Sequence, residues 1–85
     1  MTISYSKNFI KQSKKLDKST RQHLLKRIKL FSENPLDSQL NNHPLKGKYK
    51  TYRSINVTAD FKALYLTQDD HIIFDIVGTH SQLYG

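Results

Sequence analysis

The chain has 85 residues and no cysteine, which predicts one domain over residues 1–85 with a thin core and excludes a multidomain enzyme, disulfide staples and cysteine-ligated zinc. Its 14 Lys and Arg against 7 Asp and Glu give a net charge of +7. This excess favours a polyanionic partner such as nucleic acid, an anionic membrane or an acidic protein. Without cysteine, the chain fits a reducing, cytoplasmic compartment.

Residues 2–5 alternate polar and apolar side chains, which predicts a short first strand. Ser6 is a suitable N-cap, and the apolar residues that follow at helical spacing predict a first helix over about residues 7–16. Lysines occupy its remaining positions. No apolar run in this basic segment is long enough to cross a membrane, so we expect no contact with a membrane.

A second helix is expected to begin at Ser19, because Ser19 and Gln22 have the spacing of a capping box. A stripe of leucine, isoleucine and phenylalanine follows, and Asn34 and Pro35 end the helix. The connection to the first helix is very short. The two helices should therefore form an antiparallel hairpin that turns its apolar stripes toward a common sheet.

The second half of the chain is predicted to be mainly β-structure. An irregular polar loop is expected over residues 35–47. Three β-rich runs follow, over residues 50–57, 61–67 and 72–77, and their short connections predict an antiparallel meander. Residues 78–85 should form a short tail. The predicted class is α+β in the order β-α-α-β-β-β, with the helical hairpin packed on a small, twisted, mainly antiparallel sheet.

The charge is distributed unevenly between these halves. Residues 1–53 hold 13 basic and three acidic residues, a net of +10, and residues 54–85 hold one basic and four acidic residues, a net of −3. Solvation of a helix face explains any single lysine. The cluster from Lys46 to Arg53 is different, because its basic residues are interleaved with tyrosines. A surface that binds phosphates and stacks on bases requires this combination.

Two motifs resemble the RelE/ParE toxin superfamily, in particular its YafQ branch. They are His43-Pro-Leu-Lys-Gly47 and Gly78-Thr-His-Ser-Gln-Leu-Tyr-Gly85, with Tyr52, Arg53, Asp60 and Tyr65 between them. The resemblance is strong over residues 40–85 and looser in the basic helices. It implies a RelE-like microbial ribonuclease fold and a toxin that cleaves messenger RNA in the ribosomal A site, without a metal or other cofactor. The implied partners are a cognate acidic antitoxin, the 70S ribosome with its mRNA, and operator DNA only through the antitoxin complex.

Cleaving RNA without a metal requires a base for the 2′-hydroxyl, a cation for the phosphate and an acid for the departing 5′-oxygen. Histidine suits both proton roles, because its ordinary pKa is about 6.5. His43 and His80 stand beside proline or glycine in segments without periodicity, and the resemblance places both in the site. His23, within a helix, and His71, in an expected turn, are interpreted as surface or packing residues.

Further candidates have two interpretations each. Asp60 is an ordinary turn residue by its position, whereas the resemblance makes it a proton acceptor or the partner that orients a histidine. Arg53 either binds a phosphate or forms a surface salt bridge, and Lys62 is a candidate transition-state cation. Tyr84 either stacks on a base or pins the tail to the sheet. The expected RNA-binding residues are Lys46, Lys48, Tyr49, Lys50 and Tyr84.

Two residues depart from the family pattern. Ser54 and Asn56 stand where the YafQ pattern has an acidic residue and a further histidine, and neither can shuttle a proton near neutral pH. The departures favour one alternative function, a catalytically weakened homologue that binds RNA and regulates its own operon. A second alternative is a ParE-like poison of DNA gyrase, which would not need His43 and His80.

Overall fold

The computed structural model describes residues 1–84 as a five-stranded sheet with three α-helices and two short 3₁₀ turns. Gly85, the last residue of the second motif, lies outside the described residues. In chain order the elements are β1 (Thr2–Tyr5), α1 (Lys7–Lys14), α2 (Lys18–Glu33), η1 (Ser38–Leu40), β2 (His43–Pro44), η2 (Gly47–Tyr49), β3 (Arg53–Asn56), β4 (Phe61–Gln68), β5 (His71–Thr79) and α3 (His80–Tyr84).

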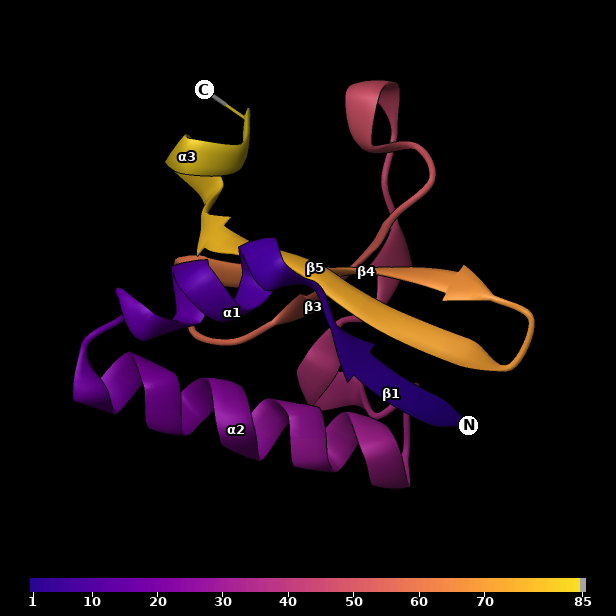
Figure 1. The fold of residues 1–85 in the computed structure, drawn as a ribbon, viewed down its shortest axis with the longest axis horizontal. Coiled ribbons are helices and arrows are strands. Elements are labelled where there is room, and N and C mark those ends of the chain that lie inside the picture. Colours follow the sequence, from indigo (N-terminus) through magenta and orange to yellow (C-terminus); the bar gives the residue numbers. More distant parts are fainter. Residues whose placement is uncertain (85) are drawn as a thin grey trace.

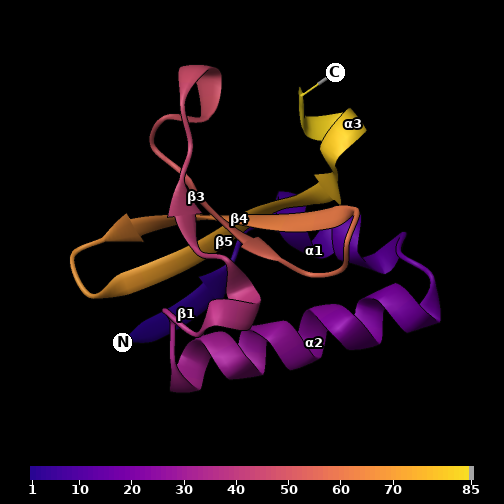
Figure 2. The same cartoon turned by 180° about the vertical axis from the view of Figure 1, so that it is seen from behind.

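The strands lie in the order β1-β5-β4-β3-β2. β1 is parallel to β5 and every other neighbouring pair is antiparallel, which confirms the expected α+β class. Figure 1 shows the sheet nearly along its edge, with α2 on one side. On the other side stand α3 and a projecting segment that we call the arm, residues 45–52, and Figure 2 shows the same two projections from behind. The sheet therefore has a helix-covered face and a second face.

Aromatic rings fill the core between α2 and the helix-covered face. Phe74 of β5 is fully buried, and its ring lies 5.3 Å from that of Phe31 and 5.5 Å from that of Tyr65, between centroids. Tilted and edge-to-face pairs of this kind add to the free energy of burial. The core cluster comprises Phe9, Leu24, Ile28, Phe31, Leu40, Ile55, Val57, Ala63, Tyr65, Ile72, Phe74 and Val77. It holds the helical hairpin against the sheet, as the apolar stripes predicted, although Ile10 and Leu25 of those stripes are exposed.

Both helix boundaries in the hairpin differ from the prediction. α2 is capped by Asp17, whose carboxylate accepts a hydrogen bond from the Thr20 amide at 3.2 Å, and not by Ser19. Hydrogen bonding from Thr20 lowers the pKa of Asp17. α1 ends at Lys14, two residues early. The Arg21 guanidinium donates to the free carbonyls at this end, at 3.1 Å for Lys14 and 2.8 Å for Leu16. No helix among residues 1–84 is long and apolar enough to span a bilayer.

Helix α1 covers an edge of β5 that β1 leaves free. β1 pairs only with residues 71–74, and the chain then turns into α1 at Ser6. Further along β5, the Gln12 side-chain oxygen accepts from the backbone amide of Val77 at 2.8 Å. The Asn8 side-chain amide donates to the backbone carbonyl of Asp75 at 3.1 Å. Side chains of α1 thus satisfy backbone groups that a further strand would otherwise bind.

The polar loop over residues 35–47 and the tail after residue 77 contain elements that the sequence analysis did not predict. The loop over residues 35–47 includes η1 and the two-residue strand β2, which pairs with β3. The next strand begins at Arg53, not at residue 50, because Gly47–Tyr49 form η2. β5 extends to Thr79, and the expected tail forms α3.

Candidate functional site

The second face of the sheet carries its own buried residues. Cross-strand partners share a face, and the row formed by Ser54, Leu64 and Ile76 lies opposite to the helix-covered face. Ser54 and Leu64 are buried there, at 1% and 0% exposure. Leu83 of α3 covers this face, and a Cβ added at Gly78 would lie 3.0 Å from the Gln82 side-chain oxygen of α3. Glycine at 78 therefore leaves room for the Gln82 side chain beside β5.

A capping box fixes the start of α3. The Thr79 hydroxyl accepts from the Gln82 amide at 3.1 Å, and the Gln82 side-chain oxygen accepts from the Thr79 amide at 2.8 Å. His80 lies inside this box, and its amide donates to the Asp60 carbonyl at 3.1 Å. The backbone of His80 is thereby fixed between α3 and the turn that joins β3 to β4.

Replacing Gln82 with alanine should lower the free energy of unfolding by about 0.5–2 kcal/mol, because the Thr79 amide loses its acceptor. Denaturant titration measures the change, and hydrogen exchange should show faster exchange of the Thr79 amide. Gln22→Ala is the matched control: Gln22 is exposed on α2 and belongs to the capping box that the sequence predicted and the structure does not form. Equal effects of the two variants would contradict the role of the α3 capping box.

A cleft of about 270 Å³ opens on the second face between the arm and α3. Its lining residues are His43, Leu45, Ser54, Lys62, His80 and Tyr84. These residues come from β2, the arm, β3, β4 and α3. The structure therefore brings both candidate histidines, the candidate cation Lys62 and Tyr84 to one site.

The ring of His43 has a defined tautomer. Its Nδ1 lies 2.7 Å from the Asn41 carbonyl oxygen, which can only accept, so Nδ1 carries a proton and donates. In the neutral ring the lone pair is therefore on Nε2. Asn41 has φ of 46°, a left-handed conformation that asparagine tolerates better than most residues. The backbone at Asn41 thus prepares His43 to accept a proton at Nε2.

Lys62 is held by one of the residues that depart from the family pattern. Asn56 lies directly opposite Lys62 in the β3–β4 pair, and its side-chain oxygen accepts from the Lys62 Nζ at 2.9 Å. The Ala59 carbonyl lies 3.5 Å from the same Nζ. Both acceptors are neutral, so the positive charge of Lys62 is not cancelled. Asp60 is exposed in the adjoining turn, where its carbonyl accepts from the His80 amide.

Aromatic rings connect the arm to α3. The His80 and Tyr84 rings lie 4.7 Å apart, and Tyr49 of the arm lies 5.8 Å from Tyr84, between centroids. Burial, with the nearby Tyr49, raises the pKa of Tyr84. The Lys48 ammonium lies 5.1 Å from the centre of the Tyr49 ring. Tyr84 thus borders the cleft and also attaches α3 to the arm.

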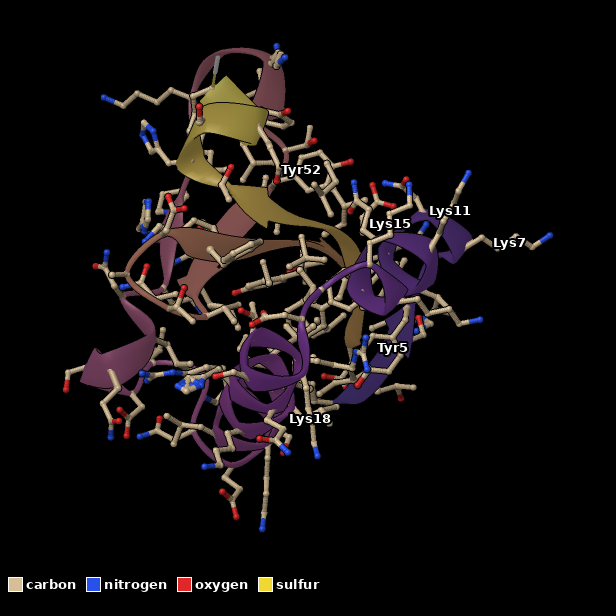
Figure 3. The ribbon with its side chains drawn as sticks, turned by 90° about the vertical axis from the view of Figure 1, so that its left-hand side faces the viewer. Tyr5, Lys7, Lys11, Lys15, Lys18 and Tyr52 are labelled. Atoms are coloured by element: carbon tan, nitrogen blue, oxygen red, sulfur yellow. The ribbon has the colours of Figure 1, made fainter. Side chains whose placement is uncertain are left out.

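The positive charge of the molecule is not neutralised internally. Within residues 1–84 the only ion pair joins the N-terminal amine to Asp70, at 3.1 Å. The arm lysines Lys46, Lys48 and Lys50 are exposed. Figure 3 shows Lys7 and Lys11 of α1 extending away from the body of the molecule. Every lysine and arginine of the described chain is therefore free of a carboxylate partner.

Arg53 and Asp60 are the catalytic candidates that do not line the cleft. Arg53 lies opposite Tyr65 on the helix-covered face, and its Nε donates to the Asn42 side-chain oxygen at 2.8 Å. Asn42 also bonds the Tyr65 hydroxyl, at 2.8 Å, so Arg53 fixes the loop before β2. His23 is exposed on α2, as expected. His71 is not in a turn: it begins β5, and its Nε2 lies 2.8 Å from the Ser4 hydroxyl.

Comparison with known proteins places this geometry in a family context. A sequence model of the family described as the bacterial toxin of type II toxin–antitoxin systems, YafQ, matches residues 1–85. The mRNA interferase toxin YafQ of Escherichia coli K12 is 37% identical over 51 residues, which are 60% of this chain and 55% of that protein. The chain thus matches about half the length of this curated relative.

Solved structures are similar over nearly the whole chain. The crystal structure of YafQ from E. coli BL21(DE3) superposes with a TM-score of 0.82 at 31% identity, covering 98% of this chain and 97% of that one. The toxin in a crystal structure of the E. coli DinJ–YafQ complex superposes with a TM-score of 0.68 at 30% identity, with the same coverage of both chains. The similarity includes the strands and α3, which together carry the cleft.

Proposed function

Because this chain belongs to the YafQ family of bacterial toxins from type II toxin–antitoxin systems, we propose that it is a ribosome-dependent endoribonuclease that cleaves messenger RNA in the A site. The observation that carries the proposal is the cleft between the arm and α3. It combines His43, Lys62 and His80, the three kinds of group that metal-independent RNA cleavage requires.

His43 is the general base in this proposal. Its Nε2 accepts the proton of the 2′-hydroxyl, because the bond from Nδ1 to the Asn41 carbonyl fixes the ring and its tautomer. The 2′-oxygen then attacks the adjacent phosphorus as the bond from phosphorus to the 5′-oxygen breaks. His80, on the other side of the cleft, donates a proton to that oxygen. The products are a 2′,3′-cyclic phosphate and a free 5′-hydroxyl.

Lys62 stabilises the charge that develops on the phosphate. Its ammonium has a fixed position on Asn56 and no carboxylate partner, so it can bind a non-bridging oxygen without breaking an ion pair. Asp60 positions His80 in this scheme, because its backbone carbonyl accepts from the His80 amide. Arg53 acts indirectly in this scheme, by fixing Asn42 next to the loop that carries His43.

The remaining surface fits RNA and an acidic protein. The exposed lysines of the arm, with Tyr49 and Tyr84, offer charge and stacking surfaces to the message and to ribosomal RNA. We further propose that a cognate acidic antitoxin binds the toxin, that operator DNA is contacted only through their complex, and that the toxin acts in the cytoplasm. The DinJ–YafQ complexes among the similar structures support such a pairing.

Induced expression in a bacterium tests the function. We expect growth arrest, cleaved messages whose new 5′-ends map within translated codons, and rescue by co-expression of the antitoxin. For a variant that lacks the His80 imidazole, His23→Ala is the matched control, since this exposed histidine lies on α2 and lines no part of the cleft. Double-strand DNA breaks with intact transcripts would instead favour a gyrase poison. Ribosome binding without any cleavage would favour the weakened RNA-binding homologue.

A further inference from the structure

The arm is attached to the sheet by few interactions. Its two ends are joined by the bond from the Leu45 amide to the Tyr52 carbonyl, at 3.1 Å, and its tip turns through the bond from the Lys50 amide to the Gly47 carbonyl, also 3.1 Å. Below it, β2 contributes only two residues to the sheet. A projection with so little backbone support needs side-chain contacts to hold one orientation.

Tyr52 supplies such a contact. Its hydroxyl donates to the Asp75 carboxylate of β5 at 2.6 Å, a short, charge-assisted hydrogen bond. No other side chain of the arm forms a hydrogen bond within residues 1–84. The bond, with burial, raises the pKa of Tyr52 to about 12. Tyr52 also lies 5.9 Å from Tyr49, between ring centroids, so the bond supports the aromatic contact at the tip.

A β-bulge places Asp75 where Tyr52 can reach it. Tyr65 pairs with Phe74 and Leu64 pairs with Ile76, so Asp75 is the extra residue of β5 and has no partner in β4. Bulges redirect a side chain in this way, and they are frequent next to active sites. The carbonyl of Asp75 accepts from the Ser6 hydroxyl at 3.2 Å and from the Asn8 amide at 3.1 Å. Asp75 is therefore fixed by α1 through its backbone and can hold the arm through its side chain.

We propose that Tyr52 and Asp75 are positioning residues that hold the basic arm in one orientation beside α3, so that its lysines meet RNA bound in the cleft. This inference rests on the proposed function for its substrate. Neither residue lines the cleft or touches the reacting atoms. Their effect is on the geometry of Lys46, Lys48 and Lys50 relative to His80, and hence on RNA binding rather than on the proton transfers.

Tyr52→Phe tests the proposal by removing one hydroxyl. Tyr5→Phe is the matched control, because Tyr5 is 43% exposed, its hydroxyl has no hydrogen-bond partner in the structure, and Figure 3 shows the two tyrosines on opposite sides of α1. We expect ¹⁵N relaxation to show larger amplitudes of motion for residues 46–51 in Tyr52→Phe only. On ribosomes programmed with a defined message, KM should rise about tenfold with kcat nearly unchanged, because a charge-assisted bond outside the reaction centre is lost.

A conservative variant and a titration separate positioning from general destabilisation. Asp75→Asn keeps an acceptor oxygen for the Tyr52 hydroxyl and should restore most of the KM that Asp75→Ala loses. In protein with ¹³C-labelled tyrosine, one ring should titrate near pH 12 in the parent and nearer pH 10 in Asp75→Ala. Since the folded pKa is the higher one, the stability from this bond is complete below about pH 10 and is lost as the pH rises toward 12.

An arm as ordered in Tyr52→Phe as in the parent would overturn the proposal, and so would a mobile arm with an unchanged KM. A parent protein that leaves messages intact would instead contradict the proposed function. The relaxation and titration results do not depend on cleavage. They therefore test the attachment of the arm in either case.

Discussion

Replacing His80 with alanine should lower the rate of RNA cleavage about 10²- to 10⁴-fold, the usual contribution of a general acid or base. The side chain of His80 is exposed at the cleft, so its loss opens no cavity in the core. Its backbone bond to the Asp60 carbonyl is also kept. Single-turnover cleavage of a ribosome-bound message measures the rate, and thermal unfolding should show a fold as stable as that of the parent.

The control for this variant is His23→Ala, which removes another exposed imidazole, from α2. The dependence of rate on pH adds a second criterion, because the loss of an acid should remove the limb at which the rate falls with rising pH. Full activity of His80→Ala, in a folded protein, would refute the proposed role of His80 and leave the cleft without an identified acid.

Replacing Lys62 with methionine should reduce cleavage about 10²- to 10³-fold, since the transition-state charge on the phosphate loses its cation. Methionine keeps most of the aliphatic stem that packs in the sheet, so the effect on stability should be small. Asn56→Ala should have a smaller effect of the same sign, because it leaves the ammonium in place but removes its acceptor at 2.9 Å. The rate of cleavage at saturating ribosome concentration distinguishes these outcomes.

Lys26→Met serves as the control, since Lys26 is exposed on α2 and away from the cleft. Similar losses in Lys26→Met and Lys62→Met would mean that both lysines contribute only to the overall charge. In that case the reduction should also disappear as salt is lowered, whereas a missing transition-state cation is not restored by low salt.

The sequence predicted the parts of the fold that periodic patterns encode. The helical hairpin and the order of the long strands follow from apolar spacing, and the structure confirms them. Capping was harder to assign. Ser19 with Gln22 and Thr79 with Gln82 have the same spacing, but Asp17 competes successfully for the start of α2, whereas nothing competes with Thr79 at α3.

The candidate site was only partly accessible from sequence. Alternation cannot assign the faces of β4, because Leu64 is as buried on the second face as Ala63 is on the first. The second face is covered in part by α3, which packs on β5 and which the sequence analysis took for a short tail. Arg53 could not be assigned to the helix-covered face either, because that assignment needs the register of β3 with Tyr65 of β4. The bond between Tyr52 and Asp75 depends on a bulge, and no local pattern marks one.

The parallel pairing of β1 with β5 has a consequence for synthesis. Thr2 pairs with His71, 69 positions later, and His43 meets His80 only when β5 and α3 are in place. Contacts so distant in sequence form late, because the loop between them must close first. A nascent chain that has not yet released α3 from the translating ribosome therefore has no assembled cleft. Under the proposed function, the chain therefore cannot cleave a message before α3 has left the ribosome.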